Sequence, residues 1–169
     1  MENNENFAIR EQAKPIFLDD AMVKKVLSNE KSELRHIVKQ SVCYLCNTSP
    51  FDKGDFLYIR ETWGEDNHNY LYKNDYSSEY LKNMKNLFRW QSSLTMPKKA
   101  ARIFLRITNI RIEHLQDISD ESVYNEGFNN KSEWINYWDT RMKKTNKLNI
   151  NGWNNNPMVW VYEVEKIEI

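Results

Sequence analysis

The segment Arg60-Glu-Thr-Trp63 places three chemically different side chains within one turn of chain. It ends an aromatic and β-branched run that predicts a strand over residues 56–60. Arg60 supplies a cation, Glu61 a hydrogen-bond acceptor and Trp63 a ring, and recognition of an unstacked nucleobase uses these three groups. Alternatively, Trp63 fills the core and Arg60 pairs with a nearby carboxylate. The segment therefore predicts either a base-binding site or part of the core.

A second set of candidate residues is the basic tract, which we define as Lys98, Lys99, Arg102 and Arg106. It lies between Glu79 and Glu113, an interval that contains no acidic residue and has aromatic residues interleaved with its cations. Such a pattern suits a groove that follows a phosphate backbone. The alternative is a solvated face whose arginines pair with the acidic residues that follow. If the tract binds nucleic acid, its replacement weakens polyanion binding without unfolding the protein.

The remaining candidates for chemistry are Cys43 and Cys46, which form a C-x-x-C motif. This motif is either half of a zinc site or a redox pair. A structural zinc site needs two further ligands, and the three histidines of the chain lack the spacing that would supply them. We therefore predict two reduced thiols, with no metal and no cofactor.

The formal net charge of zero conceals a segregation of charge along the chain. Residues 113–139 contain seven acidic side chains and a single cation, Lys131, whereas the preceding interval is basic. A folded chain with this distribution is predicted to have one positive and one negative face. No segment has the roughly 20 apolar residues of a membrane helix, and the amino terminus lacks a signal-like apolar run. We expect a cytoplasmic protein with no membrane partner.

At 169 residues, with 13% aromatic residues, four glycines and four prolines, the chain is expected to fold as one domain over residues 7–169. The polar residues 1–6 are predicted to be disordered. Residues 64–95 are predicted to form an irregular insertion, in which residues 80–88 could make a short amphipathic helix.

Hydrophobic patterning predicts the elements that must position these residues. Strands are expected over residues 15–18, 56–60, 102–108, 110–115 and 158–169, the third and fourth being either two strands or one long bent strand. Helices are expected after the capping residues Asp19 or Asp20 and Ser119, and from about Ser132. Short strands with few helices indicate an α+β fold, a small mixed β-barrel with helices packed around it.

Several blocks of the sequence, in this order and spacing, resemble the ASCH-domain proteins of bacteriophages and prophages. The blocks are Lys14-Pro-Ile-Phe17, Gly54-Asp-Phe-Leu-Tyr-Ile-Arg-Glu-Thr-Trp63, Met96-Pro97, His114-Leu-Gln-Asp-Ile-Ser119, Asn125-Glu-Gly127 and Asn156-Pro-Met-Val-Trp-Val-Tyr-Glu163. The resemblance implies a PUA-like fold, with a cleft between barrel and helices, in a protein of the host cytoplasm. Relatives of this architecture bind RNA or modified nucleobases, and a small bacterial branch hydrolyses the acetyl amide of N4-acetylcytidine.

Members of that enzyme branch combine a K-x-x-T motif with a distant glutamate. Carried onto this chain, the lysine falls on Lys31 and the glutamate on Glu126. The threonine position falls on Leu34, which has no hydroxyl and cannot attack an acyl carbon. Ser32 could replace it only if the local backbone shifted, because it lies two residues earlier. The resemblance therefore favours a binding protein over an enzyme.

We thus expect a cleft that holds RNA, a nucleotide or a modified nucleobase. The predicted ligand-binding set is Lys31, Arg35, Arg60, Glu61, Trp63 and Glu126, with the basic tract contacting the polyanion. Two alternatives remain open at this stage. One is an amidohydrolase or ribonuclease that uses Lys31 and Glu126, and the other is a phage protein that binds a host protein through its charged faces.

Overall fold

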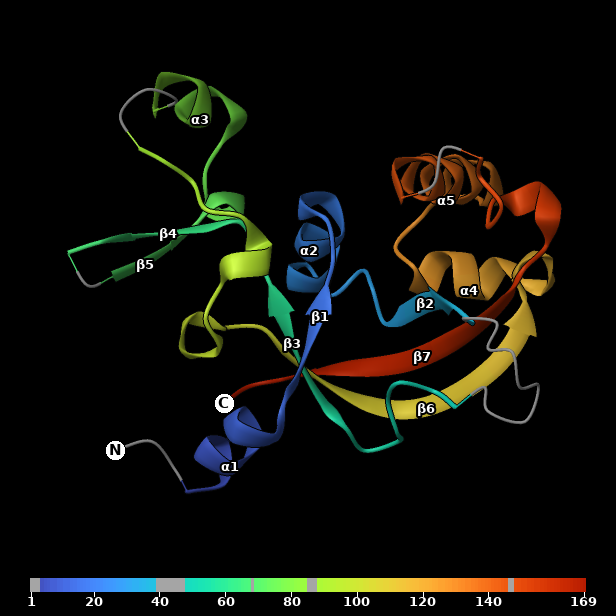
Figure 1. The fold of residues 1–169 in the computed structure, drawn as a ribbon, viewed down its shortest axis with the longest axis horizontal. Coiled ribbons are helices and arrows are strands. Elements are labelled where there is room, and N and C mark those ends of the chain that lie inside the picture. The colour runs from blue at the N-terminus through green and yellow to red at the C-terminus, as the bar shows by residue number, and fades with distance from the viewer. Residues whose placement is uncertain (1–3, 39–47, 68, 85–87, 146–147) are drawn as a thin grey trace. The chain divides into compact units, whose positions relative to one another are not determined.

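The computed structural model describes residues 4–38, 48–67, 69–84, 88–145 and 148–169 (Figure 1). It confirms an α+β protein built from a mixed sheet and several helices. The chain divides by its contacts into two compact units. Unit 1 consists of Met1–Ser28, Asp55–Arg106 and Lys166–Ile169, and unit 2 of Asn29–Gly54 and Ile107–Glu165.

Unit 1 contains a parallel and an antiparallel strand pair that share their central strand. Its elements are α1 (Asn4–Gln12), β1 (Lys14–Phe17), α2 (Asp20–Leu27), β3 (Phe56–Arg60), β4 (Trp63–Asp66), β5 (Asn69–Tyr72), α3 (Ser78–Met84) and the first residues of β6 (Phe104–His114). Strand β1 pairs parallel with β3, which pairs antiparallel with β6. Strands β4 and β5 form a separate antiparallel pair.

Of the two amino-terminal helices of unit 1, α2 begins where the sequence predicts and α1 was not predicted. Helix α2 is capped by Asp19, whose Oδ1 accepts from the amide of Met22 at 3.0 Å, as expected. Helix α1, in contrast, begins at Asn4, within the segment expected to be disordered. The Arg10 guanidinium donates to the carbonyl of Ala101 at 2.9 Å, a contact distant in sequence that the local polarity of the segment could not reveal.

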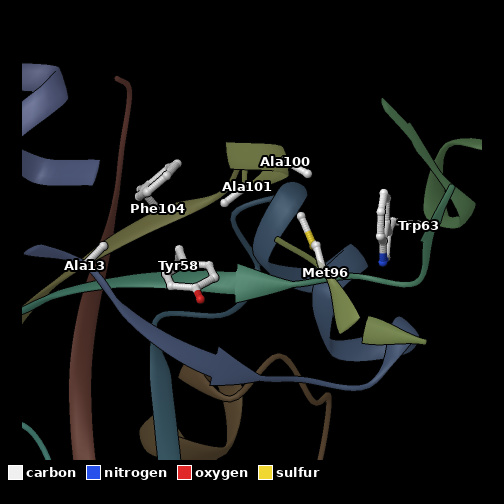
Figure 2. Packing of buried hydrophobic residues seen from close by; sticks show 7 residues of the cluster. All are labelled: Ala13, Tyr58, Trp63, Met96, Ala100, Ala101 and Phe104. Carbon is white, nitrogen blue, oxygen red and sulfur yellow. The ribbon is translucent and has the colours of Figure 1, made fainter. Parts of the chain in front are cut away.

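A cluster of apolar side chains forms the core between β3, β6 and the loop before β6 (Figure 2). Its buried members are Ala13, Tyr58, Trp63, Met96, Ala100, Ala101 and Phe104. Met96 is 2% exposed, and its Sδ accepts from the amide of Glu61 at 3.1 Å. The Met96-Pro97 block thus lies beside the strand that carries Arg60 and Glu61.

The insertion over residues 64–95 is more regular than the sequence indicates. Trp63 pairs with Tyr72 in the β4 and β5 hairpin, and it also forms a bridge with Gln91. The ring of Phe88 lies against Gly64, so closely that a Cβ added to this glycine would clash with Phe88 Cζ. The predicted helix over residues 80–88 corresponds in part to α3, which ends at Met84.

Unit 2 combines the rest of β6 with β2 (Glu33–Ile37), α4 (Asp120–Asn125), α5 (Lys131–Thr145) and most of β7 (Met158–Ile167). Its strands lie in the order β6, β7, β2, and β2 pairs antiparallel with β7. Residues 104–114 form one long strand, which decides between the two alternatives left open by the sequence. Ser119 caps α4 as predicted, its Oγ accepting from the amide of Ser122 at 3.1 Å.

Helix α5 buries one face, and α4 ends in a glycine turn. Trp134, Trp138 and Met142 are buried on α5, and the first two rings stack with centroids 5.5 Å apart. After α4 the chain turns at Gly127, whose φ of 85° lies in the left-handed region that glycine adopts without strain. These features place Glu126, directly before the glycine, at the buried end of α4.

Candidate functional site

A buried ion pair joins the start of β2 to the end of α4. The Lys31 ammonium group pairs with the Glu126 carboxylate and also donates to the Glu126 carbonyl oxygen at 3.3 Å. Lys31 is 6% exposed and Glu126 is 3% exposed. Two residues that lie 95 positions apart in the chain, and that the resemblance assigns to one site, are therefore in direct contact.

Arg35 extends this pair into a network. Its Nη1 donates to Glu126 Oε1 at 2.9 Å, and its Nη2 donates to Glu113 Oε1 at 2.8 Å. Its guanidinium carbon lies 5.8 Å from the centroid of the Trp134 ring, within the range of a cation–π contact. Arg35 is 2% exposed, so it is a buried connector between β2, β6 and α4 rather than a solvated cation.

The protonation of the buried pair follows from two opposing influences. Burial, the largest influence, lowers the pKa of Lys31 below its ordinary value of 10.5, although the Glu126 carboxylate opposes this change. Burial by itself raises the pKa of Glu126, but Lys31 and Arg35 outweigh it and hold that pKa below its ordinary value of 4.5. Glu126 is therefore a carboxylate at neutral pH, and any acid or base role of this pair would begin from that state.

Next to this network, unit 2 contains an open polar cavity of about 560 Å³, which we call the unit 2 pocket. Its volume lies in the range of small-molecule sites, about 300–1,000 Å³. It is lined by Ser32, Glu33, Thr108, Arg111, Glu113, Asp117, Ser119, Glu121, Ser122, Asn125, Glu163 and Val164. Almost every side chain in this lining can form hydrogen bonds, and the only apolar one among these described residues is Val164.

Arg111 is the single cation among the described residues that line the unit 2 pocket, and three carboxylates hold it. Its Nε donates to Glu113 at 3.1 Å, its Nη1 to Glu163 at 2.7 Å and its Nη2 to Glu33 at 3.0 Å. Nη2 also donates to Ser122 Oγ at 3.0 Å. Burial lowers and the carboxylates raise the pKa of Arg111, with a net rise above its ordinary value, so the guanidinium stays charged.

The predicted residues Arg60, Glu61 and Trp63 belong to unit 1, where Glu61 and Trp63 are buried and Arg60 is half-buried. Trp63 is 6% exposed, and its Nε1 donates to Thr95 Oγ1 at 3.4 Å. Arg60 contacts the Tyr58 hydroxyl at 3.4 Å, and Glu61 is 1% exposed. Trp63 is thus a core residue, as the second interpretation of this segment has it. The Arg60 guanidinium, in contrast, donates to the Tyr58 hydroxyl and to the carbonyl of Leu94, and it pairs with no carboxylate among the described residues.

The basic tract also has partners within unit 1. Arg102 donates to both oxygens of Glu61 at 2.8 and 2.9 Å and to both oxygens of Asp75 at 2.8 and 2.7 Å. Its guanidinium carbon lies 3.9 Å from the centroid of the Tyr72 ring. The pairing alternative named the acidic residues after position 113, whereas the carboxylates that Arg102 binds precede it in the chain.

The other members of the tract make different contacts. Lys98 Nζ donates to the carbonyl of Glu11 at 2.7 Å, and Lys99 is exposed, with its Nζ 5.9 Å from the centroid of the Tyr70 ring. Arg106 is an exposed residue of β6. Arg102 would have to give up bonds to two carboxylates before it could contact a polyanion.

The predicted ligand-binding set is thus divided between the two units. Lys31, Arg35 and Glu126 form one network in unit 2, whereas the other three residues belong to unit 1. None of the six lines the unit 2 pocket, as far as the described residues define it. Sequence reasoning missed the acidic and basic residues that do line it, although Arg111 and Glu113 have the i, i+2 spacing of one strand face.

The structure bears on the metal and membrane predictions only through the residues that it describes. No group of three or more potential metal ligands occurs among them, and the C-x-x-C motif of Cys43 and Cys46 lies outside the described residues. None of the described helices combines the length and the apolar character that crossing a membrane requires.

Comparisons with known proteins bear on the fold. The sequence matches no protein-family model and no curated protein. The structure is similar to the crystal structure of protein EF3133 from Enterococcus faecalis V583, of the family model DUF984, with a TM-score of 0.57. The alignment covers 97% of this chain and 89% of that chain at 10% sequence identity. At this identity the similarity shows a shared fold, and nothing about activity.

Proposed function

We propose that this protein is a binding module of the ASCH type, with a PUA-like arrangement of strands, that holds a nucleoside or modified nucleobase, free or within RNA. The unit 2 pocket is the proposed binding site. The observation that carries the proposal is the chemistry of this pocket, an open cavity of about 560 Å³ lined almost entirely by hydrogen-bonding side chains. Such a lining suits a small polar ligand with several donors and acceptors.

The buried network supports a binding role because it holds Glu33, a residue of the pocket lining, in a fixed position. Glu33 lines the pocket and accepts from Arg35 at 3.2 Å, from Arg111 at 3.0 Å and from Asn125 at 3.2 Å. A side chain held by so many partners loses little conformational freedom when a ligand binds. The network thus pre-organises the site.

Titration of the protein with nucleosides by isothermal calorimetry tests this proposal. Binding should be lost in Thr108→Phe, because the new ring would occupy the pocket that Thr108 lines. Ile112→Phe is the matched control, since Ile112 is an exposed residue of the same strand, β6, and lies outside the lining. Absence of binding by any nucleoside or single-stranded RNA, or equal binding by both variants, would contradict the proposal.

A second candidate function, amide hydrolysis, is favoured by one observation, the direct contact of Lys31 and Glu126. Leu34 opposes it, because this residue is 1% exposed and offers no nucleophile. Incubation with N4-acetylcytidine would distinguish the two functions. Turnover that Glu126→Gln abolishes would establish an enzyme, whereas binding without turnover would leave the binding module.

A further inference from the structure

We infer that the part of the ligand that enters the unit 2 pocket carries N–H donors and a positive charge, and that it carries no phosphate. The statement that the ligand is a nucleobase rests on the proposed function, whereas the statement that the ligand is positively charged does not. It identifies the ligand as a cationic or amino-rich base rather than a nucleotide. Two independent features of the pocket, its hydrogen-bond accounting and its charge, lead to it.

The hydrogen-bond accounting concerns Arg111, the cation of the lining. A guanidinium has five N–H donors, and Arg111 already directs its three nitrogens to Glu33, Glu113, Glu163 and Ser122. These four bonds use four of the five donors, so a phosphate could reach at most one Arg111 N–H without breaking a bond to a carboxylate or to Ser122. The guanidinium is therefore a poor phosphate site, and a ligand that brings N–H donors of its own suits the carboxylates around it better.

The carboxylates of the described pocket lining outnumber its cations. The described lining includes five carboxylates, those of Glu33, Glu113, Asp117, Glu121 and Glu163, against one guanidinium. Glu163 has 40% of its side chain exposed, and hydrogen bonds from Arg111 and Asn109 reach its Oε1. Asp117 and Glu121 are exposed. These three side chains have the accessible oxygens to which ligand N–H groups would donate.

The charge of the lining acts in the same direction. Two unit charges 4 Å apart interact by about 1 kcal/mol in water and by about 4 kcal/mol where the effective dielectric constant is 20. A phosphate in this pocket would meet unfavourable interactions with several carboxylates, whereas a cation would meet favourable ones. A base that carries a fixed positive charge satisfies both the hydrogen-bond accounting and the charge.

Four groups of probe separate charge from base identity. Adenosine and cytidine are neutral, 1-methyladenosine and 3-methylcytidine are cationic at pH 7, adenosine 5′-monophosphate is anionic, and agmatine is a cation without a base. We expect each methylated nucleoside to bind about tenfold more tightly than its parent, and the monophosphate to bind at least about tenfold more weakly. The preference for the cation should decrease with added salt.

Matched variants assign the preference to the pocket. Glu121→Gln removes one carboxylate of the lining and should reduce the ratio of cationic to neutral affinity about threefold to fivefold. Asp120→Asn, in the adjacent exposed residue of α4 that is not part of the lining, should leave the ratio within about twofold. Equal reduction by both variants would indicate a general effect of protein charge and would overturn the inference.

The outcomes also separate this inference from the proposed function. Equal or tighter binding of the monophosphate would overturn the inference and leave nucleobase binding intact. Agmatine binding that Glu121→Gln weakens, without binding of any nucleoside, would support the charge selection and remove the nucleobase function. Failure of every probe to bind would overturn both.

Discussion

At the scale of single residues, Glu61 and Arg102 form a pair in which one partner is fully buried. The Glu61 side chain has 0% exposure, while Arg102 is 29% exposed. Arg102→Met would leave the buried carboxylate without its guanidinium, and we expect the free energy of unfolding to fall by about 3–5 kcal/mol. Urea denaturation measures this change.

Two further variants control this experiment. Arg106→Met changes the other arginine of the same tract, an exposed residue of β6, and should cost at most about 1 kcal/mol. The double variant Glu61→Met and Arg102→Met should regain most of the lost stability, because no buried charge remains. Equal losses in the two single arginine variants would refute this account of the pair. Arg102 is thus the member of the basic tract whose replacement is expected to destabilise the protein, contrary to the sequence-based expectation.

His36 predicts a dependence of stability on pH. Its ring lies in edge contact with Tyr162 at 5.8 Å and Phe51 at 6.2 Å, and its Nε2 is buried without a hydrogen-bond partner among the described residues. Burial, with a smaller contribution from Arg141, lowers the pKa of His36 from 6.5 to about 4. Below pH 6.5 the unfolded chain therefore takes up a proton that the folded chain does not, and stability decreases as the pH falls toward 4.

His36→Phe removes this proton uptake. The stability lost between pH 7 and pH 4 should be smaller in the variant than in the unchanged protein, by at most about 3 kcal/mol. Urea denaturation at several pH values over this interval measures the difference. Parallel stability curves for the two proteins would show that His36 does not contribute.

The residue scale also shows how far the sequence could predict the site. It identified Lys31, Arg35 and Glu126, which the structure joins in one buried network. It could not identify Arg111 as the centre of the pocket lining, because two of the three carboxylates that bind Arg111, those of Glu33 and Glu163, are distant from it in the chain. Pairing of this kind is fixed by the register of strands and not by local spacing.

At the scale of elements, the contact of Phe88 with Gly64 holds residues 88–91 beside β4. Gly64→Ala would place a Cβ in steric conflict with Phe88 Cζ, so the ring must move. We expect a loss of about 1–3 kcal/mol, measured by thermal unfolding. In a Phe88→Leu background, where the ring is absent, the same glycine substitution should cost clearly less. An equal cost in both backgrounds would locate the strain elsewhere.

Elements were predicted best where apolar residues form a clear run or stripe and local signals mark the ends. Strand β3 and helix α2 are confirmed nearly to the residue, since apolar spacing and the Asp19 cap define them. Strand β2 was not predicted. Its sequence, Glu33-Leu-Arg-His-Ile37, has three polar residues in five, and the structure buries Glu33 and Arg35 in the ion-pair network. Burial of charged residues reverses the hydrophobic pattern on which strand prediction depends.

At the scale of the whole molecule, β6 and β7 connect the two units through continuous strands. Residues 104–106 of β6 belong to unit 1 and residues 107–114 to unit 2, while β7 passes from unit 2 into unit 1 after Glu165. Each unit is also made of discontinuous segments. We therefore expect one cooperative unfolding transition rather than two.

Thermal unfolding followed by far-ultraviolet circular dichroism and by tryptophan fluorescence tests this expectation. The two signals should give coincident transitions, and Arg102→Met in unit 1 should shift both by the same amount. Separate transitions, or a shift confined to one signal, would mean that the units unfold independently.

The continuity of β6 also determines where insertions and deletions of residues can be tolerated. Side chains of a strand alternate between its two faces, so inserting one residue between Arg106 and Ile107 would exchange the faces of every later position of the strand. Arg111 and Glu113 would then leave the unit 2 pocket, although the insertion lies several residues away. The turn between β4 and β5 has no such dependence, because among the described residues these two strands pair only with each other and with Gln91. Among related genes, insertions and deletions should therefore accumulate at that turn and be absent from the middle of β6.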